Sequence, residues 1–431
     1  MTSRDVDAGA GARPTGPASG GGQVRAGGAQ GVSAAVLSGT LIAVNALAYV
    51  FTVLAARTLS PAAYGELAAL LGVLLVGTVP ASGLQTHAAL RLGARREHRT
   101  AEARQVHTAA VLLAAGVGTA TLVAGLPLAA LLHLDGPGTV ALLAVQLVPY
   151  TLVGGYHGIL QGSGRYGRLA AVTAVFGAAR LIGGLAGLLV EGTAGAALGG
   201  LAVGSCVGAA ATWIWTGRPG LSGRRSAPVG PALRSSAALL GFVLLSNVDL
   251  LLARHHLSAD AAGGYAVGSI VFKVVFWLPQ GVAVVLLPRL GDPAGRAREL
   301  PRGLAVVAVM GGVLTLGAAV LGPQTLHLIG GPAHGAHLGG VVWLFAALGT
   351  LLGVAQLLLF SAIATRAGAG VTAVWIAVAV EVGAVTVLAA VTTPSVVEVV
   401  GCATASAALL VGVGLCRLRS ELRWAETRTA G

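Results

Sequence analysis

The chain has 431 residues, of which 55% are hydrophobic and only 10% are charged, and its net charge is +12. A soluble domain carries about 25% charged residues, so this composition excludes an ordinary water-soluble protein. The positive charge does not indicate nucleic-acid binding, because the cations border apolar stretches instead of gathering on one polar surface. The three cysteines have neither the spacing of a disulfide framework nor that of a metal site, and we expect no cofactor and no metal.

Residues 1–30 are rich in Gly and Ala with scattered charges, and such a segment is expected to form a disordered tail. About twelve apolar stretches follow, each long enough to cross a bilayer core of about 30 Å as a helix. The stretches are unbroken and show no polar/apolar alternation, so a β-barrel is not expected. The predicted spans are 32–56, 66–90, 107–132, 138–161, 169–190, 193–216, 236–256, 265–288, 303–326, 338–362, 370–391 and 395–416.

Arginine residues cluster in every second gap between these spans and are nearly absent from the other gaps. Of the 27 basic residues, 23 fall in the arginine-rich gaps and in the two terminal segments. Two others, Arg57 and Arg254, fall on the opposite side, and two lie within spans. Short loops rich in Lys and Arg stay in the cytoplasm. The pattern therefore predicts an all-α, multi-pass protein of the plasma membrane with both termini in the cytoplasm.

The second half of the chain repeats the first at an offset of 197 to 201 residues, which indicates two related six-helix lobes. Six spans are an even number, so both lobes run in the same direction, as in parallel repeats related by an axis along the membrane normal. We expect an N-lobe at 31–216, a basic linker at 217–234, a C-lobe at 235–417 and a cytoplasmic tail at 418–431. The matching pairs include Arg57 and Arg254, Ser60 and Ser258, Tyr64 and Tyr265, Pro80 and Pro279, and Arg91 and Arg289.

Four charged residues lie within the predicted spans, where charge is costly and usually functional: Arg180, Lys273, Asp249 and Glu381. Lys273 is the only lysine of the chain, and it either forms an ion pair with Asp249 or binds a diphosphate in a cavity. Arg180 is either a phosphate ligand or an arginine tied to helix carbonyls. Glu381 and Asp249 are candidate acids for coupling transport to a cation, although Glu381 also fits a hydrogen-bonded packing role.

Several uncharged polar residues within the spans are further candidates for a substrate cavity, namely Asn45, Gln85, His157 and Asn247. Pro80 and Pro279 occupy matching positions in the two halves, and a proline kinks a helix, so both are candidate gating kinks. Three histidines between two spans are interpreted as a solvated loop and not as a metal site: His327, His334 and His337.

The run Ala-Ala-Arg-Thr-Leu-Ser-Pro-Ala-Ala-Tyr-Gly at 55–65 resembles a signature of polysaccharide-biosynthesis membrane proteins. These are the Wzx-type flippases of the multidrug/oligosaccharidyl-lipid/polysaccharide (MOP) exporter superfamily, which has a MATE-like fold. Asn247-Val-Asp249 and Gly264-Tyr265 are similar to the seventh and eighth helices of the same family, and Arg180 fits its pattern. The resemblance covers roughly residues 33–416.

This resemblance implies an alternating-access carrier that moves a lipid-linked oligosaccharide, usually on a polyprenyl diphosphate, or exports a polysaccharide precursor. Its expected partners are the lipid bilayer, the lipid-linked glycan, a coupling proton or sodium ion, and other polysaccharide-assembly proteins, with no nucleic acid. The alternative within the superfamily is a cation-coupled multidrug antiporter. A membrane glycosyltransferase or ligase is a weaker alternative, because the expected outer loops are short and hold no paired carboxylates.

Overall fold

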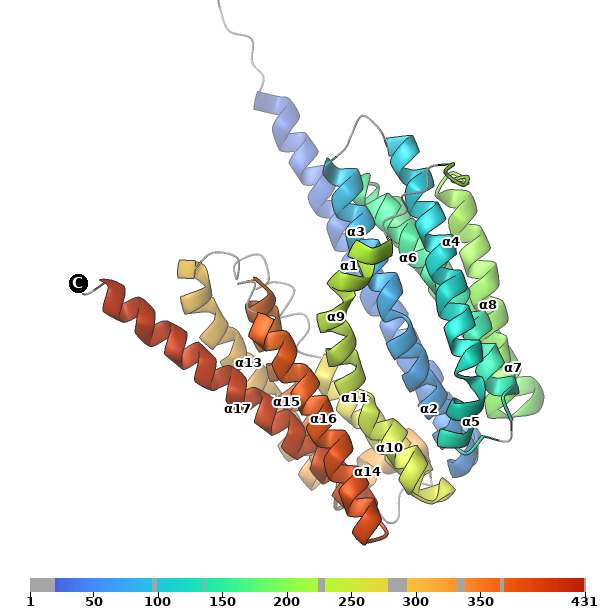
Figure 1. Ribbon diagram of the computed structural model, residues 1–431, viewed down its shortest axis with the longest axis vertical. Coiled ribbons are helices and arrows are strands. Elements are labelled where there is room, and N and C mark those ends of the chain that lie inside the picture. Colours follow the sequence, from blue (N-terminus) through green and yellow to red (C-terminus); the bar gives the residue numbers. More distant parts are fainter. Residues whose placement is uncertain are drawn as a thin grey trace, which may run out of the picture.

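In the computed structural model the helices form two groups, an N-lobe and a C-lobe, that lie side by side (Figure 1). The structure describes residues 20–94, 99–134, 136–223, 229–277, 293–331, 338–364 and 368–429, and every regular element in these ranges is an α-helix. The N-lobe contains α1 (Gly20–Thr58), α2 (Pro61–Gly77), α3 (Val79–Ala94), α4 (Arg99–Val123), α5 (Gly125–Leu131), α6 (Gly138–Gly162), α7 (Tyr166–Glu191) and α8 (Ala194–Trp215). The C-lobe contains α9 (Val229–Leu245), α10 (Val248–His256), α11 (Ala259–Trp277), α13 (Pro293–Val320), α14 (Gly322–Gly330), α15 (Val342–Ala364), α16 (Gly368–Val391) and α17 (Val396–Thr429).

Within the described residues, eleven helical segments are long and apolar enough to cross a membrane. The remaining predicted span, 236–256, is present as two shorter helices, α9 and α10, which meet at Ser246 and Asn247. Ser246 Oγ and Asn247 Nδ2 both donate hydrogen bonds to the carbonyl of Val243, at 3.0 and 2.8 Å. Polar side chains of this kind let a membrane helix break without leaving its carbonyls unpaired. The chain is a multi-pass helical membrane protein, as the sequence predicts.

The prediction for the N-terminal segment needs correction, and the prediction for Pro279 falls outside the described residues. Helix α1 begins at Gly20, so residues 20–30 are helical and not disordered as expected. Extending a formed helix adds one hydrogen bond for each residue that is fixed, which favours continuing the first span toward the N-terminus. Pro279 and the rest of the predicted span after Trp277 lie outside the described residues.

The matching serines of the repeat, Ser60 and Ser258, are helix N-caps in both halves. Ser60 Oγ accepts a hydrogen bond from the Ala63 backbone N–H (3.3 Å) at the start of α2. Ser258 Oγ accepts one from the Ala261 N–H (3.4 Å) at the start of α11. Serine is a favoured N-cap because its oxygen satisfies a backbone donor that has no partner within the helix. The repeat therefore places the second span of each lobe in the same way.

Helices α7 and α8 pack with their backbones in contact, through glycines four residues apart on each helix. A methyl group built on Gly183 would overlap the carbonyl of Gly200, and one built on Gly200 would overlap the carbonyl of Gly183. Gly187 and Gly204 make equally close approaches, to the carbonyls of Ala196 and Ala179. Small residues at this spacing let membrane helices approach closely, where van der Waals packing replaces the hydrophobic effect.

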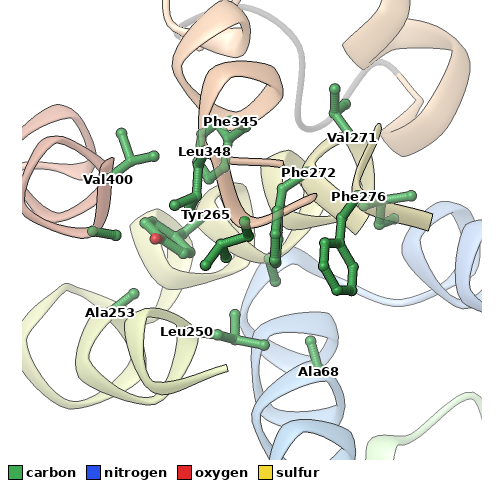
Figure 2. Packing of buried hydrophobic residues seen from close by; sticks show 14 of the residues in the cluster. Ala68, Leu250, Ala253, Tyr265, Val271, Phe272, Phe276, Phe345, Leu348 and Val400 are labelled. Atoms are coloured by element: carbon green, nitrogen blue, oxygen red, sulfur yellow. The ribbon is translucent and has the colours of Figure 1, made fainter. Parts of the chain in front are cut away.

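The largest buried hydrophobic cluster contains residues of both lobes. Figure 2 shows Ala68 of α2 next to Leu250 of α10 and to Phe272 and Phe276 of α11. The rings of Phe272 and Phe276 are 6.0 Å apart, a separation typical of favourable aromatic pairs. The second helix of the N-lobe is therefore the main contact of that lobe with the C-lobe.

The two ends of the molecule differ in charge and in how closely the lobes approach. We call the end that carries both termini and the clustered arginines the arginine-rich end, and the other the arginine-poor end. At the arginine-poor end α2 and α11 begin in contact, since a methyl group on Gly65 would lie 2.9 Å from the Gly263 nitrogen. Toward the arginine-rich end α13 and α17 diverge from α1 and α4 (Figure 1).

Candidate functional site

A cavity of about 260 Å³ lies between the lobes, at mid-length of the helices. Its wall comes from α1, α2, α6, α7 and α8 of the N-lobe and from α11 of the C-lobe. Two cations line it, Arg180 of α7 and Lys273 of α11, and its described lining includes no Asp or Glu. The other polar or aromatic lining residues are Asn45, Tyr49, Phe51, Thr52, Tyr64, Thr78, Tyr150, Ser269 and Trp277.

Arg180 is held in the cavity by an aromatic side chain. Its guanidinium carbon lies 4.7 Å from the ring centroid of Tyr150, and Phe176 meets Tyr150 edge-on at 5.0 Å. The buried Nε of Arg180 has no hydrogen-bond partner among the described residues. The sequence leaves two alternatives for Arg180, a phosphate ligand or an arginine hydrogen-bonded to helix carbonyls. No hydrogen bond to a helix carbonyl is found in the described part of the chain. The arrangement leaves N–H donors of Arg180 available to an anion.

The expected ion pair between Asp249 and Lys273 is not formed in the described structure. Tyr265 donates a hydrogen bond from its hydroxyl to Asp249 Oδ2 at 2.7 Å, and this tyrosine lies on the same helix as Lys273. Lys273 follows Tyr265 by eight residues, which places it about 12 Å further along α11 at 1.5 Å per residue. A direct salt bridge is therefore not found among the described residues, although the charges of Asp249 and Lys273 are close enough to interact electrostatically, and Lys273 also lines the cavity.

Two buried carboxylates, Asp249 and Glu381, lie close together inside the C-lobe, and the buried Asn247, at the break between α9 and α10, turns its side-chain oxygen toward Gly72 of the N-lobe. Asp249, Glu381 and Asn247 are 2%, 1% and 3% exposed, and one oxygen of each has no hydrogen-bond partner among the described residues. Glu381 of α16 is close enough to Asp249 and Tyr265 to interact with both electrostatically. Buried carboxylates are costly unless they are paired, protonated or bound to a cation, so this cluster is a candidate coupling site.

Other predicted site residues lie elsewhere. Gln85 donates a hydrogen bond to Gln161 Oε1 at 3.1 Å, which joins α3 to α6 within the N-lobe. His157 and Asn247 do not belong to the described wall of the cavity, whereas Asn45 does. Pro80 is the second residue of α3 and follows the break at Thr78, so a helix interruption does occur at the predicted position.

The sequence alone does not indicate Tyr150 or Tyr265 as partners of the intramembrane charges. Tyr265 could have been found from its match to Tyr64 in the repeat, since both are almost fully buried, at 0% and 1% exposed. Tyr150 offers no comparable signal, because it lies one span away from Arg180 and belongs to no repeated pair. Of the histidines between α14 and α15, His327 is the last-turn residue of α14, and His334 and His337 lie outside the described residues.

No protein-family model matches the chain. No curated protein matches it either.

Comparison with solved structures finds several similar folds. One is a multidrug resistance MATE family transporter of the MOP superfamily in an inward-facing conformation, with a TM-score of 0.68, 14% identity, and coverage of 86% of this chain and 94% of that chain. An outward-facing structure of such a transporter matches with a TM-score of 0.61, 13% identity, and coverage of 92% and 95%. A MOP superfamily transporter from Pyrococcus furiosus, described by the reversed polarity of its binding pocket, matches with a TM-score of 0.52, 13% identity, and coverage of 90% and 94%. The chain has the fold of the MATE transporters of the MOP superfamily.

Proposed function

We propose that the chain is an alternating-access carrier that moves a lipid-linked oligosaccharide, held on a polyprenyl diphosphate, across the plasma membrane. The observation that carries this proposal is the cationic cavity. Arg180 from the N-lobe and Lys273 from the C-lobe line the same space, and its described wall holds no carboxylate. A cavity of this charge suits an anion and disfavours a cationic drug.

The two cations are suited to different parts of a diphosphate. The guanidinium of Arg180 can bind two phosphate oxygens at once, and the ammonium of Lys273 is a compact point charge. Charge-assisted hydrogen bonds of this kind are about twice as strong as neutral ones. Because the cations come from different lobes, a diphosphate between them would connect the lobes. The cavity of about 260 Å³ is smaller than a whole lipid-linked oligosaccharide, so most of the glycan and of the lipid would extend beyond it.

Coupling to a cation is the second part of the proposal. Asp249 and Glu381 are neighbouring buried carboxylates of the C-lobe, each with one oxygen that has no hydrogen-bond partner among the described residues, and neither lines the described cavity wall. Oxygen ligands suit hard cations such as sodium, and a carboxylate can equally carry a proton. We place the arginine-rich end, with both termini, in the cytoplasm, so that an ion entering from the arginine-poor end would drive return of the empty carrier.

A cation-coupled multidrug antiporter is the second candidate function. Two of the similar structures are multidrug resistance transporters, and the buried carboxylates of the C-lobe fit cation coupling. The similar Pyrococcus furiosus transporter is described as having a pocket of reversed polarity that suggests a different function. The fold therefore accepts cavities of more than one charge, and the charge of the cavity becomes the deciding property.

The test is a flipping assay in proteoliposomes with a fluorescent polyprenyl-diphosphate oligosaccharide. Transfer between leaflets is followed by the access of an external quencher to the labelled glycan. We expect the wild-type protein to flip this lipid and the Arg180→Ala and Lys273→Met proteins to lose most of that activity. Arg302→Ala is the matched control, because Arg302 is a largely exposed arginine whose ion-pair partner is Glu299, three residues away on the same helix.

A parallel assay measures efflux of an organic cation, such as ethidium, from the same proteoliposomes under a proton or sodium gradient. Gradient-driven efflux of the dye, together with no flipping of the diphosphate lipid, would establish the antiporter and reject the flippase. Formation of a glycosidic product by the purified protein alone would reject both carriers in favour of an enzyme.

A further inference from the structure

Arg254 joins the C-lobe to the N-lobe at the arginine-poor end. It lies in the last turn of α10 and is only 8% exposed. Its Nε donates a hydrogen bond to the carbonyl of Leu132 at 3.0 Å, and its Nη2 donates one to the carbonyl of His133 at 3.4 Å. These two carbonyls directly follow the last residue of α5 in the N-lobe. Arg254 therefore caps the C-terminus of a short helix in the opposite lobe.

Arg57 makes the reciprocal contact in the other direction. It lies in the last turn of α1 in the N-lobe, and its Nε donates a hydrogen bond to the carbonyl of Leu328 at 3.0 Å. The Nη2 of Arg57 donates to the same carbonyl. Leu328 lies in the last turn of α14, a short helix of the C-lobe. Each lobe thus contributes one arginine to the short helix of the other.

The internal repeat relates the two contacts. The offset of 197 residues that relates Arg57 to Arg254 also relates Leu131, the last residue of α5, to Leu328 of α14. His255 adds to one side, because its Nδ1 lies 2.8 Å from the carbonyl of Leu131. Arg254 binds the carbonyls one and two residues beyond Leu131, so the two arginines bind corresponding helix ends and not strictly matching carbonyls. The recurrence of such a contact in both halves indicates that it belongs to the repeated fold.

The chemistry of the contacts explains why arginine occupies these positions. The last carbonyls of a helix have no partner within the helix, and the helix dipole places partial negative charge there. An arginine offers several N–H donors and a fixed positive charge to such a terminus. Arg57 and Arg254 are also the two arginines that the charge pattern places on the outer side, where basic residues are otherwise avoided.

We propose that Arg57 and Arg254 form a paired latch that holds the two lobes together at the arginine-poor end and must release both short helices before that end can open. The proposal rests on the alternating access of the proposed function. It assigns the closed side to four elements, the last turns of α1 and α10 and the C-termini of α5 and α14. The close approach of Gly65 and Gly263, at the starts of α2 and α11, lies at the same end of the molecule.

The test measures the separation of the lobes directly, without any substrate. Spin labels are placed on Glu191→Cys, at the end of α7, and Thr392→Cys, just after α16, which are exposed positions at the arginine-poor end of the two lobes. Distances are measured by double electron–electron resonance in lipid nanodiscs. The background carries serine in place of the three natural cysteines, Cys206, Cys402 and Cys416.

We expect a short distance to dominate in the protein with both arginines. In the double variant Arg57→Ala/Arg254→Ala the ratio of the longer-distance to the shorter-distance population should rise about tenfold, the factor that corresponds to about 1.4 kcal/mol. Each single variant should give a smaller rise, and Arg254→Ala the larger of the two because Arg254 is the buried member. Lysine at both positions should give an intermediate rise, because the charge remains and the multiple donors are lost.

A second label pair reports the opposite end, with Thr100→Cys at the start of α4 and Ser420→Cys on α17, both exposed. Its distance should shorten in the double variant, as expected if opening one end closes the other. Arg302→Ala, which removes an exposed arginine at the arginine-rich end, should change neither distance.

An unchanged distance distribution at the arginine-poor end of a folded double variant would overturn the latch. If the double variant did not fold, the single Arg57→Ala protein would carry the test, because that side chain is exposed at the surface. The distances are independent of what the protein transports. If the wild-type protein did not flip the diphosphate lipid but the arginine variants showed the expected distance changes, the proposed substrate would be rejected and the latch would stand.

Discussion

The guanidinium of Arg180 lies over the ring of Tyr150, with 4.7 Å between its central carbon and the ring centroid. A cation–π contact of this kind contributes about 0.5–2 kcal/mol, the higher value when the pair is shielded from water. It fixes the cation against one wall of the cavity without using its N–H donors. The N-lobe therefore holds a positioned charge whose hydrogen bonds are kept for a ligand.

Replacing Arg180 by alanine should abolish flipping of a diphosphate lipid while the protein remains folded. The variant loses charge-assisted hydrogen bonds worth about 1.5–3 kcal/mol each, so activity should fall by about tenfold or more. Tyr150→Phe keeps the aromatic ring and should retain most of the activity. The measurement is the initial rate of leaflet transfer, normalised to the amount of protein in the liposomes; a wild-type rate for Arg180→Ala would remove this residue from the site.

Replacing Lys273 by methionine should reduce transport without lowering stability. The lysine makes no direct salt bridge among the described residues, and Asp249 keeps the hydrogen bond from Tyr265 when the lysine is lost. Methionine keeps the approximate length of the lysine side chain and removes its charge. Thermal unfolding in detergent checks stability, and the flipping assay checks activity. A large fall in unfolding temperature would show instead that Lys273 has a structural role.

Replacing Tyr265 by phenylalanine should destabilise the C-lobe and alter the dependence on the coupling ion. The variant removes the donor to Asp249 Oδ2 and leaves a buried carboxylate oxygen without that partner. Such a loss costs about 1–3 kcal/mol. Asp249→Asn and Glu381→Gln should instead keep the shape of the site and lose the response to a proton or sodium gradient. The check compares unfolding temperature with transport at several sodium concentrations and pH values; an unchanged ion response in both amide variants would reject the cluster as the coupling site.

Replacing Gly200 by alanine should separate α7 from α8, whereas the same change at the neighbouring Gly199 should be nearly neutral. A methyl group on Gly200 would overlap the backbone carbonyl of Gly183, but one on Gly199 would lie at an ordinary 3.8 Å from Leu142. Overpacking of this kind costs about 1–3 kcal/mol. The two variants have the same composition, so a difference in unfolding temperature reports the backbone contact alone. Equal effects would contradict it.

Much of the fold could be predicted from the sequence, because the bilayer imposes simple rules on it. Span length follows from membrane thickness, and the alternation of arginines follows from the cytoplasmic retention of basic loops. Ser60 and Ser258 were recognised as a repeated pair, and the structure shows them as matching helix caps. The break at Asn247 was not predicted, because the hydropathy of 236–256 is that of an unbroken span.

The site was predicted only in part. The two cations of the cavity were identified from their rarity within the spans, since Arg180 and Lys273 are the basic residues that interrupt apolar stretches. Their partners could not be identified, because an ion pair depends on depth along two helices. Asp249 was assigned to Lys273 from approximate depth alone. Its hydrogen-bond partner is instead Tyr265, which lies about two turns before Lys273 on the same helix.

The break in the seventh span has a mechanical consequence. Helix α9 packs against α3 of the N-lobe and α16 of the C-lobe, and α10 beyond the break packs against α2 of the N-lobe and against α11, α16 and α17 of the C-lobe. A rigid span attached in this way would resist rotation of one lobe against the other. Two separate segments joined at Ser246 and Asn247 can bend there at a lower cost, because both of these side chains donate hydrogen bonds to the carbonyl of Val243 at the break. We expect this joint to bend when the lobes move, so that α9 and α10 need not shift as one rigid rod.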